Sequence, residues 1–284
     1  MTAPLGALVR LRVNHRPVSV RLAEETGTAD ADAEATRTPT TLWGMLAASK
    51  RQYGWDGVFA GWLWMLLTAL AAFFTSRGAL HALEKINYPR GMDAQSTAAM
   101  VLTSLLIIPL CVVTTREMVT PFNEWSAYQR SLHIQPLHKL LTAEERANPL
   151  RLYSWGLVAA VALRSSIYFV VLPRIKHALL GVIPILWVDM PHWYAFWGSA
   201  FLFTTCLTPL DVLVARLAAQ RSDELGTYSN SDGGMRLIEI RSPPYAGLVD
   251  AVSCILQEEG WTAFFRGWVW TGLFAMAVST VLML

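Results

Sequence analysis

The chain has 284 residues, of which 54% are hydrophobic and 15% are charged, and its formal net charge at pH 7 is +2. Soluble domains average about 25% charged residues, so this composition is not typical of a soluble globular protein. The small net charge and the absence of a basic block give no indication of nucleic acid binding. Three scattered cysteines, Cys111, Cys206 and Cys254, form neither a disulfide framework nor a metal-ligand spacing.

Apolar runs recur along the whole chain, at 62–83, 97–115, 156–173, 193–219 and 267–284. Several of them approach the roughly 20 residues that an α-helix needs to cross the hydrocarbon core of a bilayer. One or two such runs could be buried core helices, but five in a chain of this length predict a multi-pass membrane protein.

The polar connections alternate between long and short. Residues 16–55, 120–155 and 220–262 form long connections, whereas 84–95 and 174–192 are brief. This alternation predicts that the long connections lie on one side of the membrane. Each of them also contains a short amphipathic segment.

A proline element appears three times. It begins at Pro4, Pro109 and Pro209, and these prolines are 105 and 100 residues apart. A self-similar period of that length indicates a repeated structural unit. The pattern predicts three repeats within a single transmembrane domain, over residues 1–95, 96–190 and 191–284.

A second, glycine-based element follows the proline element. In the third repeat it runs from Glu259-Gly260 to Arg266-Gly267, and in the first from Tyr53-Gly54 to Ala60-Gly61, with the second glycine seven residues after the first. Each second glycine opens an apolar run. The middle copy, which ends at Gly156, matches the other two poorly.

Together, these two elements and the triple repeat resemble the mitochondrial carrier (solute carrier) family over nearly the whole chain. The resemblance implies an all-α membrane protein in which three repeats close a six-helix barrel, with each proline kinking an odd-numbered helix. Only Met1–Ala3 precede Pro4, and the last apolar run ends at Leu284. We therefore expect truncated first and last helices and a barrel wall that is open between them.

The proline elements depart from the family pattern Pro-x-Asp/Glu-x-x-Lys/Arg, whose acids and bases pair between repeats to close a gate. The acid positions are held by Gly6, Cys111 and Asp211, and the basic positions by Val9, Thr114 and Val214. Since one of six charges remains, we expect no ring of ion pairs. Arg216 lies on a different helix face from Asp211, so we expect Asp211 to meet water or a loop.

The resemblance also places substrate contacts seven and eight residues after the glycine that opens each even-numbered helix. The corresponding residues are Thr68 and Ala69, Leu163 and Arg164, and Phe274 and Ala275. Arg164 is the charged residue of this set, and a charge within a membrane helix is a candidate functional residue. Arg164 and Thr68 are the candidate substrate-binding residues. The alternative is a structural Arg164 satisfied by helix carbonyls, Ser165, Tyr168 or a partner chain.

In the family, helix starts such as those at Gly61 and Gly267 hold cardiolipin phosphates through backbone N–H groups, to which Arg266 would add a charge. A plain helix start with a tight glycine turn is the alternative. The sequence indicates no other cofactor, no metal site and no catalytic nucleophile–base pair, so we do not expect an enzyme.

Three functions remain open at this stage. The first is a structural or accessory subunit of a larger complex in the mitochondrial inner membrane, for example a respiratory complex, with transport lost and with lipids and protein subunits as partners. The second is a divergent transporter of a small anionic metabolite centred on Arg164. The third is an outer-membrane carrier homologue that acts in membrane dynamics or protein insertion.

Overall fold

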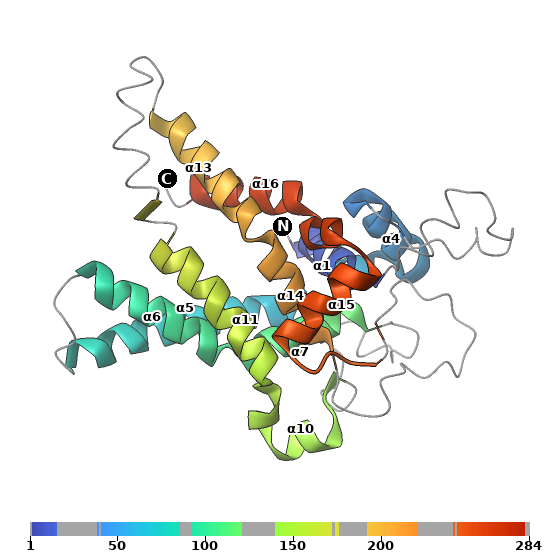
Figure 1. The fold of residues 1–284 in the computed structure, drawn as a ribbon, viewed down its shortest axis with the longest axis horizontal. Coiled ribbons are helices and arrows are strands. Elements are labelled where there is room, and N and C mark those ends of the chain that lie inside the picture. The colour runs from blue at the N-terminus through green and yellow to red at the C-terminus, as the bar shows by residue number, and fades with distance from the viewer. Residues whose placement is uncertain are drawn as a thin grey trace, which may run out of the picture.

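A computed structural model describes residues 2–15, 39, 41–85, 92–120, 140–171, 174–175, 192–220, 241 and 243–281 (Figure 1). Every regular element in these ranges is helical, which confirms the all-α prediction for this part of the chain. The helices are α1 (Thr2–Val13), α4 (Leu42–Val58), α5 (Trp62–Lys85), α6 (Met92–Leu106), α7 (Ile108–Val119), α10 (Ala143–Ala147), η1 (Pro149–Leu152), α11 (Trp155–Ser166), η2 (Ile167–Val171), α13 (His192–Cys206), α14 (Thr208–Ala219), α15 (Leu248–Glu258), η3 (Trp261–Phe265) and α16 (Trp268–Val281). Large parts of the predicted connections, and the ends of the predicted runs 156–173 and 267–284, lie outside the described residues.

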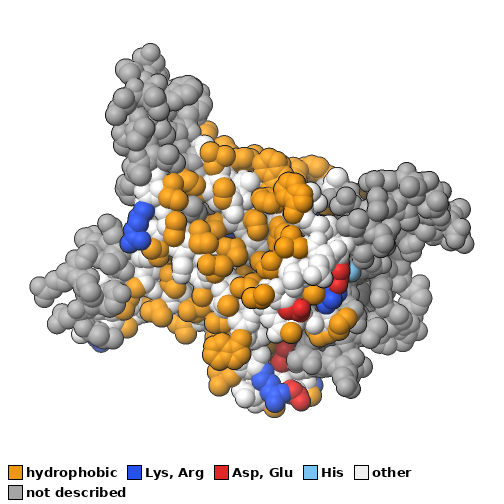
Figure 2. All heavy atoms as spheres, viewed as in Figure 1, with side chains coloured by type: hydrophobic (Ala, Val, Ile, Leu, Met, Phe, Trp, Pro, Cys, Tyr) orange, Lys and Arg blue, Asp and Glu red, His pale blue; other side chains and the backbone are white. Residues whose placement is uncertain are grey.

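Among the described helices, α5 is long and apolar enough to cross a membrane by itself, with 24 residues and none of them buried. The pair α6 and α7 makes a second candidate span if it is counted as one bent helix. Apolar side chains cover much of the surface in Figure 2, and charged ones gather mainly at the end where α10 and α15 lie. This distribution is what a hydrocarbon-facing body with a polar end requires.

Two breaks divide the odd-numbered helices of the second and third predicted repeats. The axes change direction by 51° between Gln95–Leu106 and Ile108–Val119, and α13 likewise gives way to α14 at Leu207. Pro109 and Pro209 are the second residues of α7 and α14. Proline has no N–H to donate and fits the first turn of a helix, so each proline starts a new segment.

The segments after these breaks pack together. Helices α1, α7 and α14 contact one another in all three pairings. Around them, α5 packs against α6, α6 against α11, α11 against α14, and α13 against α16. A buried apolar cluster from α7, α11, α14 and α15 fills the space beside this centre and includes Val112, Ala160, Leu213 and Ile255.

The first and last helices, α1 and α16, were expected to leave the barrel wall open between them. Over the described residues they are in contact. Leu8 of α1 lies against Gly267, at the start of α16, and Ala7 and Leu8 pack beside Trp270 and Phe274. Arg12 of α1 donates a hydrogen bond to Thr271 Oγ1 of α16. Apolar contact and a buried polar contact thus join the two helices, contrary to the expectation.

The glycine elements have the same backbone shape in the first and third predicted repeats. Gly54 and Gly61 have φ of 69° and 76°, and Gly260 and Gly267 have φ of 80° and 76°. These values lie in the left-handed region, which glycine enters without steric strain. The glycines therefore set the turns from which α5 and α16 begin.

Gly267→Ala should destabilise the protein, because a methyl group there would lie 2.3 Å from Leu8 Cδ1 in addition to the strained φ. We expect a loss of at least about 1–3 kcal/mol, the range for a residue held in a sparsely populated conformation. Thermal unfolding in detergent measures it. Gly78→Ala in α5 is the matched control, because a methyl group there meets nothing within 4 Å; an equal loss in both variants would contradict the prediction.

Candidate functional site

Three buried arginines lie in the last turns of α1, α7 and α14: Arg10, Arg116 and Arg216, with 2%, 3% and 3% of their surface exposed. The Nε of each donates to a backbone carbonyl of the next helix in the cycle. The three bonds are Arg10 to Met118 O at 2.6 Å, Arg116 to Ala218 O at 3.2 Å and Arg216 to Arg12 O at 3.0 Å. We call these three side chains the arginine ring.

The accepting carbonyls obey one rule, since each lies two residues after the arginine of its own helix. Two members of the ring also reach the carbonyl four residues after that arginine, Arg116 to Gln220 O and Arg216 to Asn14 O. The last carbonyls of a helix have no partner within the helix and carry partial negative charge. Each guanidinium therefore satisfies the helix end of a neighbouring repeat.

The arginine ring also corrects the alignment of the first repeat. Pro109 and Pro209 precede their ring arginines by seven residues, whereas Pro4 precedes Arg10 by six. The bonding pattern thus aligns Ala3, not Pro4, with the other two prolines. The gate positions of the first repeat move from Gly6 and Val9 to Leu5 and Leu8, which are also uncharged.

Two members of the ring have carboxylate partners that sequence reasoning missed. Both oxygens of Glu145 accept from Arg116, at 2.6 and 2.9 Å. Glu145 also forms a capping box with Thr142 at the start of α10, which fixes the carboxylate in place. The spacing Thr-x-x-Glu is a known sequence signature of that box and could have revealed this residue.

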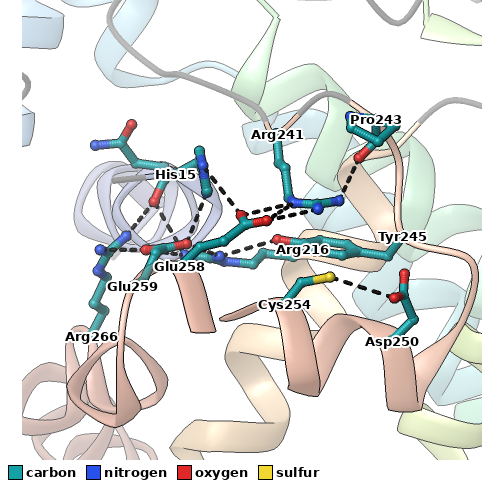
Figure 3. Close-up of polar contacts among 11 residues, drawn as sticks. His15, Arg216, Arg241, Pro243, Tyr245, Asp250, Cys254, Glu258, Glu259 and Arg266 are labelled. Carbon is teal, nitrogen blue, oxygen red and sulfur yellow. Dashed lines mark hydrogen bonds and ion pairs between the residues drawn. The ribbon is translucent and has the colours of Figure 1, made fainter. Parts of the chain in front are cut away.

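Glu259 is the carboxylate partner of Arg216 and is fully buried (Figure 3). It also accepts from His15 Nδ1 at 3.0 Å and pairs with Arg266 at 2.6 Å. Burial opposes the ionisation of Glu259, but the hydrogen bonds from His15 and Arg216 and the charges of Arg216 and Arg266 outweigh it and lower the pKa to about 2. Glu259 is therefore a carboxylate throughout the physiological range.

Glu258, the neighbour of Glu259, extends this network outward. Its carboxylate lies 3.6 Å from His15 Nε2 and accepts hydrogen bonds from Arg241 at 2.7 to 3.0 Å. Figure 3 shows both contacts. These contacts hold the end of α1 against α15. In the first repeat, Tyr53 stands where Glu259 does, immediately before the glycine, and Arg10 donates to Ser49 Oγ at 2.8 Å.

The intramembrane charge Asp211 is paired, contrary to the expectation that it meets water or a loop. Its Oδ2 lies 3.2 Å from Arg12 Nη2, and its Oδ1 accepts from Arg164 Nε. Arg164 therefore has an internal partner that sequence reasoning did not identify. One carboxylate thus joins α1, α11 and α14, one helix from each predicted repeat, although no ring of three pairs forms among the described residues.

Thr68, the other candidate substrate-binding residue, lies in a separate contact. Its hydroxyl donates to Trp64 O at 2.7 Å and lies 3.0 Å from Thr114 Oγ1, which joins α5 to α7. Within the described part of the chain, no hydrogen bond joins Thr68 to Arg164 or to Asp211. Substrate binding by either residue stays a prediction.

The candidate lipid-binding residues lie where the helices α5 and α16 begin. A methyl group on Gly61 would meet Met118 Cγ at 2.9 Å, so this turn packs closely on α7. Arg266 is turned toward Glu259 and also donates to Asn14 O (Figure 3). Its guanidinium thus already has internal partners, and phosphate binding at Gly61 and Gly267 stays a prediction.

Comparison with known families identifies the last third of the chain. Residues 191–284 match the family model described as mitochondrial carrier protein. The match begins where the third repeat was predicted to begin, and it supports the predicted resemblance over that one repeat. No curated protein matches the chain. Members of the family are typically transporters, which agrees with the prediction that the chain is not an enzyme.

Glu259→Gln should strongly destabilise the protein, because it removes the buried charge that faces Arg216, Arg266 and His15. Breaking a buried ion pair on one side costs about 3–5 kcal/mol, and thermal unfolding in detergent measures the loss. Glu258→Gln is the matched control, since the Glu258 side chain is one-third exposed and exposed pairs contribute about 0–1 kcal/mol. Equal effects of the two variants would contradict the assigned role of Glu259.

Proposed function

We propose that the chain is a member of the mitochondrial carrier family, whose model its last third matches, and that it has a structural or accessory role in a larger complex of the inner mitochondrial membrane. In this proposal three repeats form a six-helix barrel, and the protein has lost transport. Membership of that family implies a mitochondrial membrane. The inner membrane, the barrel and the accessory role are further parts of the proposal.

The order of helix contacts supports the barrel. Going round the molecule, α1 contacts α5, α5 contacts α6, α6 contacts α11, and α11 contacts α14. Helix α13, which continues into α14, packs on α16, and Arg12 and Thr271 join α16 back to α1. The cyclic bonds of the arginine ring follow the same threefold order.

The observation that carries the loss of transport is the pairing of Arg164 with Asp211. Arg164 is the one charged residue among the six positions inferred to face the substrate, and an internal carboxylate already pairs with it. A ligand can shift a protein between two conformations only as far as it binds one of them better. The remaining side chains at those positions offer an anion or cation little differential binding.

The arginine ring supports the same conclusion. Alternating access would require the ends of α1, α7 and α14 to separate, and separation would remove the carbonyl partners of three buried guanidinium groups. A buried charge that loses its partners is strongly unfavourable. Five of the six positions that form the family's acid–base pairs are uncharged in this chain, among them Cys111, Thr114 and Val214. These positions therefore cannot supply ion pairs that break and re-form.

The outer surface supports a role inside an assembly or the lipid around it. Helix α5 presents Leu66, Leu70, Phe73 and Phe74 outward, each more than 40% exposed. In a bilayer these side chains meet lipid tails or the helices of partner subunits.

A specific observation favours a second candidate, the transporter of a small anion. The Arg164 side chain remains 39% exposed despite its contact with Asp211. If Arg164 binds a transported anion, Arg164→Ala abolishes exchange in proteoliposomes, whereas unchanged uptake removes this candidate. The third candidate, an outer-membrane protein, predicts that protease cleaves the long connections in intact mitochondria.

The accessory role predicts that the protein migrates with a large assembly. Gently solubilised mitochondria are separated by native size, and the chain is followed by mass spectrometry. We expect co-migration at a fixed ratio with a set of membrane subunits, because an accessory subunit has a stoichiometric place. Migration alone at the size of a monomer would contradict the proposal.

A further inference from the structure

The cluster around Asp211 places one acidic and two basic side chains from the three predicted repeats in contact. Arg12 comes from α1, Arg164 from α11 and Asp211 from α14. Asp211 is 9% exposed, and each of its two oxygens faces a different guanidinium. Its carboxylate is thus fully engaged between the two arginines.

The charges of this cluster do not balance. Two guanidinium groups face one carboxylate, and Arg12 also donates a hydrogen bond to the neutral hydroxyl of Thr271. The Nε of Arg12 is buried and makes no hydrogen bond. A surplus positive charge among apolar helices is unfavourable, so the two arginines depend on the single carboxylate that lies between them.

The contact with Asp211 leaves part of the Arg164 side chain exposed. Asp211 accepts a hydrogen bond from the Nε of Arg164, and 39% of the Arg164 side chain is exposed. Guanidinium groups bind carboxylates best through two parallel N–H donors. Asp211 therefore satisfies Arg164 incompletely, as a shared ligand must.

We propose that Asp211 is an internal plug in an anion site formed by Arg12 and Arg164. Its carboxylate occupies the place that the carboxylate of a small organic anion would take, and the chain thereby blocks its own site. The inference rests on the proposed function in treating α1, α11 and α14 as helices around one interior. It adds the physical reason why that interior takes up no anion.

Chemical rescue tests the plug. Asp211→Ala removes the carboxylate and leaves Arg12 and Arg164 with no acid between them, so the melting temperature in detergent should fall. Sodium acetate, which carries the same carboxylate group as the aspartate side chain, should then restore most of the lost melting temperature with saturable concentration dependence. Wild-type protein should show no such response, because its own carboxylate fills the site.

Three controls make the test specific. Sodium chloride at equal ionic strength should not reproduce the effect of acetate, and Asp211→Ala combined with Arg164→Gln should abolish it. Where Asp211→Ala gives no folded protein, Asp211→Ser, whose short side chain also leaves room for acetate, serves in its place. A folded variant on which acetate acts no better than chloride, or equally well without Arg164, would overturn the proposal. Native-size migration of the wild type tests the accessory role separately.

Discussion

The fold depends on buried guanidinium groups at the ends of three helices. Helices α1, α7 and α14 converge, and their last carbonyls would be left unpaired in an apolar surrounding. Arg10, Arg116 and Arg216 meet that requirement by donating to the carbonyls of the neighbouring helix. Because each arginine donates to a helix of another repeat, the ring holds the three repeats together. Glu145 and Glu259 supply the opposite charges for Arg116 and Arg216.

The small number of charged residues also explains the contacts of Asp211 at the centre of the molecule. A carrier gate needs several acid–base pairs that can break and re-form, but this chain retains Asp211 alone among the expected gate charges. That single carboxylate lies between Arg12 and Arg164, so it joins three helices in place of opposing one base. The hydrogen bonds of the arginine ring and the pairing of Arg164 with Asp211 both favour one conformation. In the accessory role that we propose, a single conformation would serve to hold partners in place.

Sequence reasoning succeeded where the constraint is local to the backbone. The helix breaks before Pro109 and Pro209 and the turns at Gly61 and Gly267 follow from the missing N–H of proline and the left-handed φ of glycine. It failed where partners are distant in sequence. Arg12 lies 199 residues from Asp211 and Arg164 lies 47 away, so no local pattern reveals the cluster. The one-residue error at Pro4 arose because the first turn of a helix tolerates proline at more than one position.

The central claim is that the ends of the odd-numbered helices stay joined. Distance measurement by pulsed electron spin resonance tests it most directly, with nitroxide labels at Thr120 and Gln220, which follow α7 and α14, in a chain whose native cysteines are replaced. In lipid bilayers we predict a single short-distance population that added organic anions do not change. A second population at a larger distance would show that the ends of α7 and α14 separate, and would contradict the account.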